Sequence, residues 1–170
     1  DVAVPGLRAT ENATSVKLPG VQGLRVDVLA PGARLGSIVR VPELAWAAQT
    51  VPHYGYLLEA SEPGAMLAGG HCIPVRLPQA VRFVWHKLYA STQRRGFREK
   101  AAKDQRQALL LAAVLAESEP LALKLAFAEA PASMTRAIKP LYASLVKRLG
   151  AHPVLGEMLA ECLSVHGKHD

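Results

Sequence analysis

The side chains of this sequence that could do chemistry are concentrated between residues 76 and 107, and Lys87 is the most informative of them. On a helical wheel at about 100° per residue, Lys87 falls in the middle of an apolar face. Burying an ammonium group is costly unless an anion or a ligand compensates for it. We therefore expect Lys87 to have a partner, and Asp104 is the obvious candidate in the protein itself.

The face that contains Lys87 belongs to a helix expected to begin near Pro78. Its apolar residues are Ala80, Phe83, Val84 and Leu88. The residues expected to face solvent are Gln79, Arg82 and His86. A lysine in water would be expected among the second group.

A second helix is expected from Phe97 to about residue 117. Its apolar stripe contains Phe97, Ala101, Ala108, Ala112 and Leu115, with Asp104 at the border. Residues 109–115 are apolar on all sides, which predicts a helix packed on several sides. Lys87 and Asp104 could then form either a substrate-binding site or a structural ion pair between two helices, and the pattern leaves both open.

Several short motifs in this region resemble those of a known family. They are Val75-Arg76-Leu77-Pro78, Arg82-Phe83, His86-Lys87-Leu88, Arg94-Arg95 and Lys103-Asp104-Gln105-Arg106-Gln107-Ala108, preceded by Gly23-Leu24-Arg25-Val26-Asp27-Val28-Leu29-Ala30-Pro31. Together they resemble a family of bacterial proteins with a nucleotidyltransferase fold, within the DNA polymerase beta superfamily. Distant relatives include the abortive-infection nucleotidyltransferase toxins.

The resemblance implies roles for the carboxylates. Asp27 would be the third carboxylate of the superfamily's metal triad and a catalytic residue, and Asp104 a catalytic carboxylate in the same cleft. Asp1 would belong to the Asp-x-Asp pair on an earlier strand and would be a second metal ligand. The implied cofactor is Mg²⁺ or Mn²⁺.

The resemblance also implies how the substrate would be held. Lys87 would act in catalysis and bind the phosphates of an NTP, together with Arg94, Arg95 and Lys103. The family's Gly-Ser turn, whose backbone donors hold phosphates, has no counterpart before Asp1. We therefore expect this sequence to be part of a longer protein, whose full-length form would carry the complete active site.

The implied reaction is metal-assisted transfer of a nucleotidyl group from an NTP to an acceptor, which could be RNA, a protein or a small molecule. An alternative of another class is a non-catalytic helical module that binds nucleic acid or a partner protein. An upstream sequence without a second aspartate and a Gly-Ser turn would favour the alternative.

The pattern of elements predicts an α+β fold. Residues 1–77 would be the remainder of a nucleotidyltransferase-like catalytic domain with a partial mixed β-sheet, and residues 78–170 a helical bundle. We expect strands at 24–29 and 37–41 and a short helix at 43–50. A hairpin is expected to join 65–67 to 73–77 across Gly69-Gly70. In the bundle, Met134, Ile138, Leu141, Leu145, Leu149, Leu155, Leu159 and Leu163 are expected in the core.

Composition limits the kinds of partner and the cellular compartment that we expect for this protein. The formal charge of +6 favours polyanionic partners such as NTPs or nucleic acid. Two cysteines far apart in sequence do not make a disulfide framework, which favours the cytoplasm. No uninterrupted apolar run is long enough for a membrane-spanning helix, so we expect no membrane association.

Overall fold

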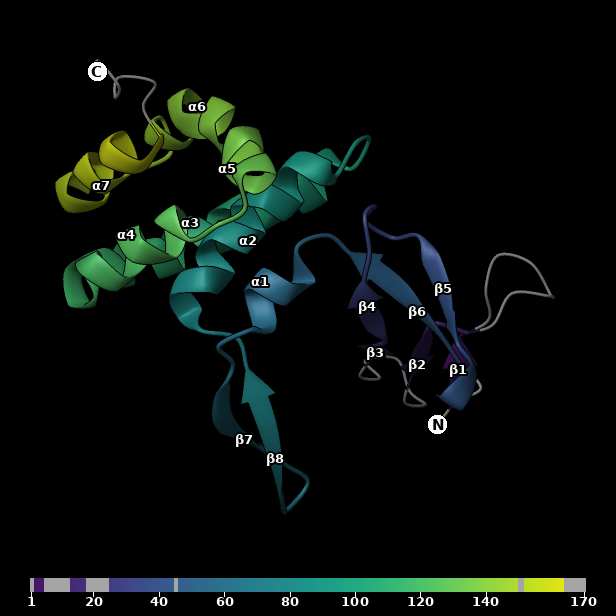
Figure 1. Ribbon diagram of the computed structural model, residues 1–170. Helices are drawn as coiled ribbons and strands as arrows, with labels where there is room; N and C mark the ends of the chain where they lie inside the picture. Colours follow the sequence, from purple (N-terminus) through teal and green to yellow (C-terminus); the bar gives the residue numbers. More distant parts are fainter. Residues whose placement is uncertain (1, 5–12, 18–24, 45, 150–151, 164–170) are drawn as a thin grey trace. The chain divides into compact units, whose positions relative to one another are not determined.

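The computed structural model describes residues 2–4, 13–17, 25–44, 46–149 and 152–163 (Figure 1). It has the predicted α+β fold, with small sheets followed by helices. The residues group into two compact units, Asp1–Gly55 and Tyr56–Asp170. The two units are separated by how their residues pack. The boundary expected after residue 77 separates a catalytic domain from a helical domain by function, so it stays a prediction.

The first unit contains two small sheets. In one, β1 (Val2–Val4), β2 (Ser15–Lys17) and β3 (Arg25–Asp27) are antiparallel, with β2 in the middle. In the other, β6 (Trp46–Val51) lies between β4 (Leu29–Pro31) and β5 (Ile38–Val41). Since β4 is parallel and β5 antiparallel to β6, the second sheet is mixed, as predicted.

The helix predicted at residues 43–50 is wrong. The described residues of this range form a short 3-10 turn, η1 (Pro42–Leu44), and the strand β6 from Trp46 onward. Ala47 and Ala48 are both fully buried because β6 is the central strand of its sheet, so the strand lacks the polar and apolar alternation that would reveal it. Pairing with strands on both sides outweighs the helix propensity of two alanines.

The second unit begins with α1 (Tyr54–Leu58), which spans the division, and a β-hairpin that projects from the helices (Figure 1). The hairpin pairs β7 (Glu62–Ala68) with β8 (His71–Leu77). Gly69 and Gly70 adopt φ values of +56° and +79°, which only glycine accepts readily in a two-residue turn. The predicted hairpin is therefore confirmed, and both of its strands are longer than expected.

The helices that follow are bounded largely by glycine and proline. They are α2 (Ala80–Gln93), α3 (Arg98–Ser118), α4 (Pro120–Ala128), α5 (Ala132–Ile138), the 3-10 turn η2 (Lys139–Leu141), α6 (Tyr142–Val146) and α7 (Pro153–Leu163). Gly96, with φ +80°, lies in the turn between α2 and α3. Pro120 and Pro153 occupy first helical positions, where the missing N–H costs no hydrogen bond.

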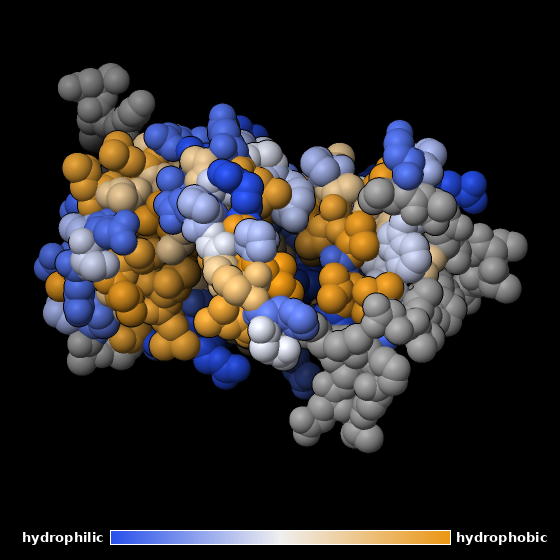
Figure 2. Space-filling model, turned by 90° about the horizontal axis from the view of Figure 1, so that it is seen from below, coloured by the Kyte–Doolittle hydropathy of each residue, from blue (hydrophilic) through white to orange (hydrophobic). Residues whose placement is uncertain are grey.

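The hydrophobic core of this unit is built around α2. Six of the predicted core residues are buried, namely Met134, Ile138, Leu145, Leu155, Leu159 and Leu163, while Leu141 and Leu149 are partly buried against them. Trp85 is fully buried and its Nε1 donates a hydrogen bond of 2.9 Å to the Leu123 carbonyl. Apolar residues also gather on the surface of the helical part, at the left of Figure 2.

Tyr56 connects the start of the unit to this core. Its hydroxyl donates a buried hydrogen bond of 2.7 Å to the carbonyl of Ala126 in α4. Burial raises the pKa of the Tyr56 phenol, so the hydroxyl remains protonated and able to donate.

Among the described residues, no helix is long and apolar enough to cross a membrane.

We expect Tyr56→Phe to lower the free energy of unfolding by about 1 kcal/mol, because it leaves the buried Ala126 carbonyl without its donor. Chemical denaturation of the purified protein measures the change. Tyr142→Phe is the matched control, since the partly buried Tyr142 donates no side-chain hydrogen bond among the described residues. Equal stability of the two variants would contradict a structural role for the Tyr56 hydroxyl.

Candidate functional site

The position of Lys87 on α2 differs from the predicted one. The buried side of α2 is centred on Trp85 and Leu88, and Lys87 lies at its edge with a side chain that is 22% exposed. The wheel placed Lys87 at the centre because it considered α2 alone. In the fold, α2 packs against α3, α4 and α5, so its buried sector is broader and turned towards Val81 and Tyr89.

The broader buried sector of α2 also contradicts the exposure predicted for two residues near Lys87. His86 was expected to face solvent, but it is only 6% exposed. Arg82 was expected to face solvent as well. Its guanidinium instead donates to the Tyr56 carbonyl at 3.0 Å and pairs with Glu129 at 2.7 Å, and it lies 4.9 Å from the centre of the Tyr56 ring. Arg82 thus holds α1, α2 and the end of α4 together.

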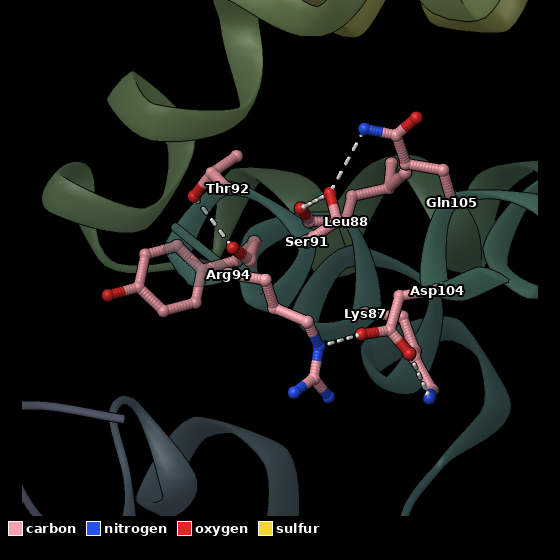
Figure 3. Close-up of polar contacts among 8 residues, drawn as sticks. Lys87, Leu88, Ser91, Thr92, Arg94, Asp104 and Gln105 are labelled. Atoms are coloured by element: carbon pink, nitrogen blue, oxygen red, sulfur yellow. Dashed lines mark hydrogen bonds and ion pairs between the residues drawn. The ribbon is translucent and has the colours of Figure 1, made fainter. Parts of the chain in front are cut away.

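The predicted contact between Lys87 and Asp104 is present. Lys87 Nζ lies 2.8 Å from Asp104 Oδ1, and it also lies over the Phe83 ring at 5.5 Å from the ring centre. The second carboxylate oxygen, Oδ2, accepts a hydrogen bond from Arg94 Nε at 2.5 Å (Figure 3). One carboxylate therefore holds two cations, and we call Lys87, Arg94 and Asp104 the cationic cluster.

Burial and charge act in opposite directions on Asp104, which is only 3% exposed. Burial alone would raise the pKa of its carboxyl group. The hydrogen bonds from Lys87 and Arg94 outweigh that effect and lower the pKa below its ordinary value. Asp104 is therefore ionised at neutral pH, and the cluster carries a net charge of +1.

The turn between α2 and α3 determines which atoms of Arg94 remain available. Arg94 caps α2, and its carbonyl accepts a hydrogen bond from the Phe97 N–H at 3.2 Å across Gly96. Because Nε makes the bond to Asp104, the two terminal nitrogens point away from the carboxylate (Figure 3). Within the described residues these terminal nitrogens make no further hydrogen bond. Ser91 and Gln105 add a second polar contact between the helices, at 3.3 Å.

The structure does not bring the other predicted phosphate-binding residues into the cluster. Arg95 and Lys103 are exposed, and neither contacts the cluster among the described residues. Phe97, expected in the apolar stripe of α3, is 59% exposed and lies under Lys100, whose Nζ is 5.1 Å from its ring centre. The stripe begins one turn later because Phe97 lies outside the first turn of the helix.

Asp27 belongs to the first unit, at the end of β3. Its Oδ1 accepts hydrogen bonds from Ser15 Oγ at 2.6 Å and from Arg25 Nε at 2.8 Å. The bond from Ser15, with a smaller contribution from Arg25, holds the pKa of Asp27 below its ordinary value. Asp27 is therefore an exposed, ionised carboxylate, and none of the described contacts engages its Oδ2.

Asp27 is suitable as one ligand of a hard divalent cation, because Mg²⁺ prefers oxygen and is commonly held by one or two carboxylates together with substrate phosphates. The described residues include no group of three His, Cys, Asp or Glu side chains that could hold a metal ion. They supply one ligand and not a full set. Asp1, the second predicted ligand, lies outside the described residues.

Sequence reasoning missed the double use of Asp104. Arg94 was predicted to bind phosphates only. Its contact with Asp104 could have been predicted from Gly96, a turn residue after α2, and from the acidic residue Asp104 on the helix that follows. The pairing of Ser15 with Asp27 had no signal, because it depends on the register that places β2 beside β3.

The cationic cluster has donor groups on Arg94 that point away from Asp104, and such groups suit anionic ligands. A family model described as nucleotidyltransferase matches residues 3–132, which is most of the chain, and the chain belongs to this family. Membership supports nucleotidyl transfer in general and an NTP as substrate. No curated protein and no solved structure gives a significant match.

The lowered pKa of Asp104 predicts a specific acid sensitivity. A group whose pKa is depressed in the folded state stabilises the fold above its unfolded pKa, near 4, and this stabilisation is lost as the pH falls through the folded value. We expect urea unfolding from pH 6 to pH 2.5 to show that the stability difference between wild type and Asp104→Asn shrinks at low pH. The contribution of Asp27 is common to both proteins and cancels. A difference that is constant with pH would contradict the assignment.

Proposed function

We propose that this protein transfers a nucleotidyl group from an NTP to an acceptor, and that the cationic cluster binds the phosphates of the NTP. The membership of the nucleotidyltransferase family supports the reaction class. The observation that carries the assignment of the site is the presence of two cations on one buried carboxylate, with donors still directed outward.

An ion pair that only joined two helices would need a single cation. Lys87 alone already neutralises Asp104, so Arg94 adds a positive charge that the described residues do not compensate. The terminal nitrogens of Arg94 have the planar fork geometry that suits phosphate oxygens, whereas Lys87 offers a compact point charge. The excess charge is therefore better explained by an anionic substrate than by stability.

In this proposal each member of the cluster has a different task. Arg94 and Lys87 donate to the phosphates and stabilise the negative charge that develops during transfer. Asp104 touches neither the nucleotide nor the acceptor but positions both cations, since each of its oxygens holds one of them. Arg95 and Lys103, which are exposed, would contribute long-range attraction for the triphosphate.

Asp27 would hold Mg²⁺ or Mn²⁺ together with Asp1, and the ion would supply charge neutralisation along the triphosphate. What the chain itself contributes at Asp27 is an oriented carboxylate. Ser15 and Arg25 both bind Oδ1, which leaves Oδ2 as the oxygen available to a ligand. The acceptor could be RNA, a protein or a small molecule, and we place the reaction in the cytoplasm, where the free cysteines Cys72 and Cys162 would stay reduced.

Lys87→Met tests the phosphate-binding role without unfolding the protein. Arg94 would still compensate Asp104, so we expect the variant to lose no more than about 1–2 kcal/mol of stability. Its affinity for radiolabelled NTP should fall roughly tenfold or more, since a charge-assisted hydrogen bond is lost. Filter binding with each of the four NTPs and Mg²⁺, using the natural full-length protein, measures the change.

Two further variants make the result interpretable. Lys147→Met removes an exposed lysine just after α6 and should leave NTP binding unchanged. The double variant Lys87→Met with Arg94→Met leaves Asp104 as an unpaired buried carboxylate and should lose about 3–5 kcal/mol of stability. If Lys87→Met bound every NTP as tightly as wild type, the phosphate-binding role would be refuted.

Asp27→Asn tests the metal ligand while keeping the hydrogen bond from Ser15, because the amide oxygen still accepts. We expect calorimetric titration to show that Mg²⁺ strengthens NTP binding to wild type but has little effect on the variant. Labelled nucleotide transfer by the full-length protein should be lost. Glu43→Gln, an exposed carboxylate in η1, is the matched control. An unchanged effect of Mg²⁺ on the Asn variant would count against Asp27 as a ligand.

A further inference from the structure

The helix α3 has a second face that does not contact α2 through Asp104. Asp104, Ala108 and Ala112 are buried. Arg106 follows Asp104 by two residues, which places it about 200° further round the helix. The face that contains Arg106 is therefore opposite to the one that carries Asp104 in the cationic cluster.

This opposite face forms one wall of an apolar groove with a cavity volume of about 540 Å³. The floor consists of aliphatic side chains from α3, from the segment after α6 and from α7 itself, namely Leu109, Leu110, Ala113, Leu149 and Leu155. We call it the α3 groove. Its second wall lies beyond residue 132, where the match to the nucleotidyltransferase family ends, so the groove is not a feature of the matched region alone.

The rim of the α3 groove is positively charged. Arg106 and Arg148 line it, and both are exposed without an ion pair among the described residues. At the His152 end, Nε2 lies 3.3 Å from Glu117, and Nδ1 accepts a hydrogen bond of 3.3 Å from the Leu155 N–H. Glu117 is thus paired with His152, so within the described residues neither Arg106 nor Arg148 has an acidic partner.

The exposed apolar residues of α3 indicate what kind of surface would cover the groove. Leu110 and Val114 are 66% and 62% exposed, although residues 109–115 are apolar on all sides. The predicted packing on several sides is therefore wrong for this edge of the helix. A helix that is apolar all round normally has neighbours all round, so the bare edge of α3 has room for one more helix.

We propose that the α3 groove binds an amphipathic helix of a partner protein, with aliphatic side chains on the groove floor and acidic side chains against Arg106 and Arg148. The stretch from Arg106 to Val114 has nine residues and extends about 12 Å along the axis of α3. This length matches anchors spaced at i, i+4 and i+7 on a partner helix. The proposal does not depend on the nucleotidyl transfer proposed above.

Other occupants fit less well. A second copy of this chain would bring Arg106 and Arg148 against the same two charges in a symmetric contact. A nucleic acid strand usually stacks its bases on Phe, Tyr or Trp side chains, and none of these is among the described residues that line the groove. The charge and the floor together favour an acidic, amphipathic helix.

Because the sequence of the partner helix is not known, we would select binders from a library of displayed peptides. Its members are helical peptides of about 18 residues with leucine fixed at i, i+4, i+7 and i+11 and the other positions random. Clones are selected on the wild-type protein and counter-selected on the variant Leu110→Ser, Val114→Ser. We expect the recovered peptides to be enriched in Asp and Glu over Lys and Arg at the positions beside the leucines.

Fluorescence anisotropy with the recovered peptides then measures affinity. We expect Leu110→Ser, Val114→Ser to weaken binding roughly tenfold or more, and Arg148→Gln to weaken it roughly fivefold. The matched controls are Leu67→Ser on the hairpin, where Leu67 is 78% exposed, and Arg136→Gln on α5, and neither should change the affinity. Thermal melting confirms that all four variants fold.

Three results would overturn the proposal. The first is a selection that yields no peptide discriminating wild type from Leu110→Ser, Val114→Ser, or peptides enriched in basic residues. The second is self-association of the wild type, seen by sedimentation equilibrium and lost in that variant, which would make a second copy the occupant. The third is saturable binding of 11-(dansylamino)undecanoic acid in the absence of any helix binder, which would make the groove a small-ligand site.

Discussion

A carboxylate that is 3% exposed between two helices needs compensating cations, and Asp104 has two. This requirement fixes how α2 and α3 lie against one another. Lys87 and Arg94 both reach the same carboxylate, one from the middle of α2 and one from its end, so sliding or rotation of α3 would break at least one of these contacts. The alanines Ala108 and Ala112 then allow close approach of the helices over the rest of their contact. The contact between α2 and α3 thus determines both the arrangement of the cationic cluster and the packing of the core.

The contacts of the cationic cluster hold its two cations in the way that the proposed phosphate-binding role requires. Side chains as long as lysine and arginine lose considerable conformational entropy when they are immobilised by a ligand. Here Asp104 immobilises both before any ligand binds, and the Gly96 turn holds Arg94 at the end of α2. The entropy cost is therefore met in folding and not in binding, which is the physical basis of preorganisation. In the proposed phosphate site, the buried carboxylate of Asp104 would thus favour anion binding, although it carries a negative charge itself.

The sequence predicted the cluster better than the helix that bears it. The pairing of Lys87 with Asp104 followed from one rule, that an ammonium among apolar side chains needs a partner. The face of α2 was misplaced because burial depends on α3, α4 and α5, which a single-helix wheel does not contain. The β6 strand was mistaken for a helix for the same reason, since its two neighbouring strands supply what its alanines do not indicate. The need of a buried charged group for a partner could be predicted from the sequence. The elements that pack against α2 and β6 could not, because they are distant in sequence.

The two proposed binding sites lie on opposite faces of α3. The face of Asp104 is closed by α2 and is polar only at the helix start, where the cationic cluster lies. The face of Arg106 is open, aliphatic and basic, and its second wall comes from residues that follow the matched family region. A partner that covered the α3 groove would contact the same rigid helix that positions Lys87 and Arg94. Because α3 runs unbroken from Arg98 to Ser118, movement of its bare edge would be transmitted to Asp104 only as a rigid-body shift, so any coupling between the two faces would act through the α2–α3 contact.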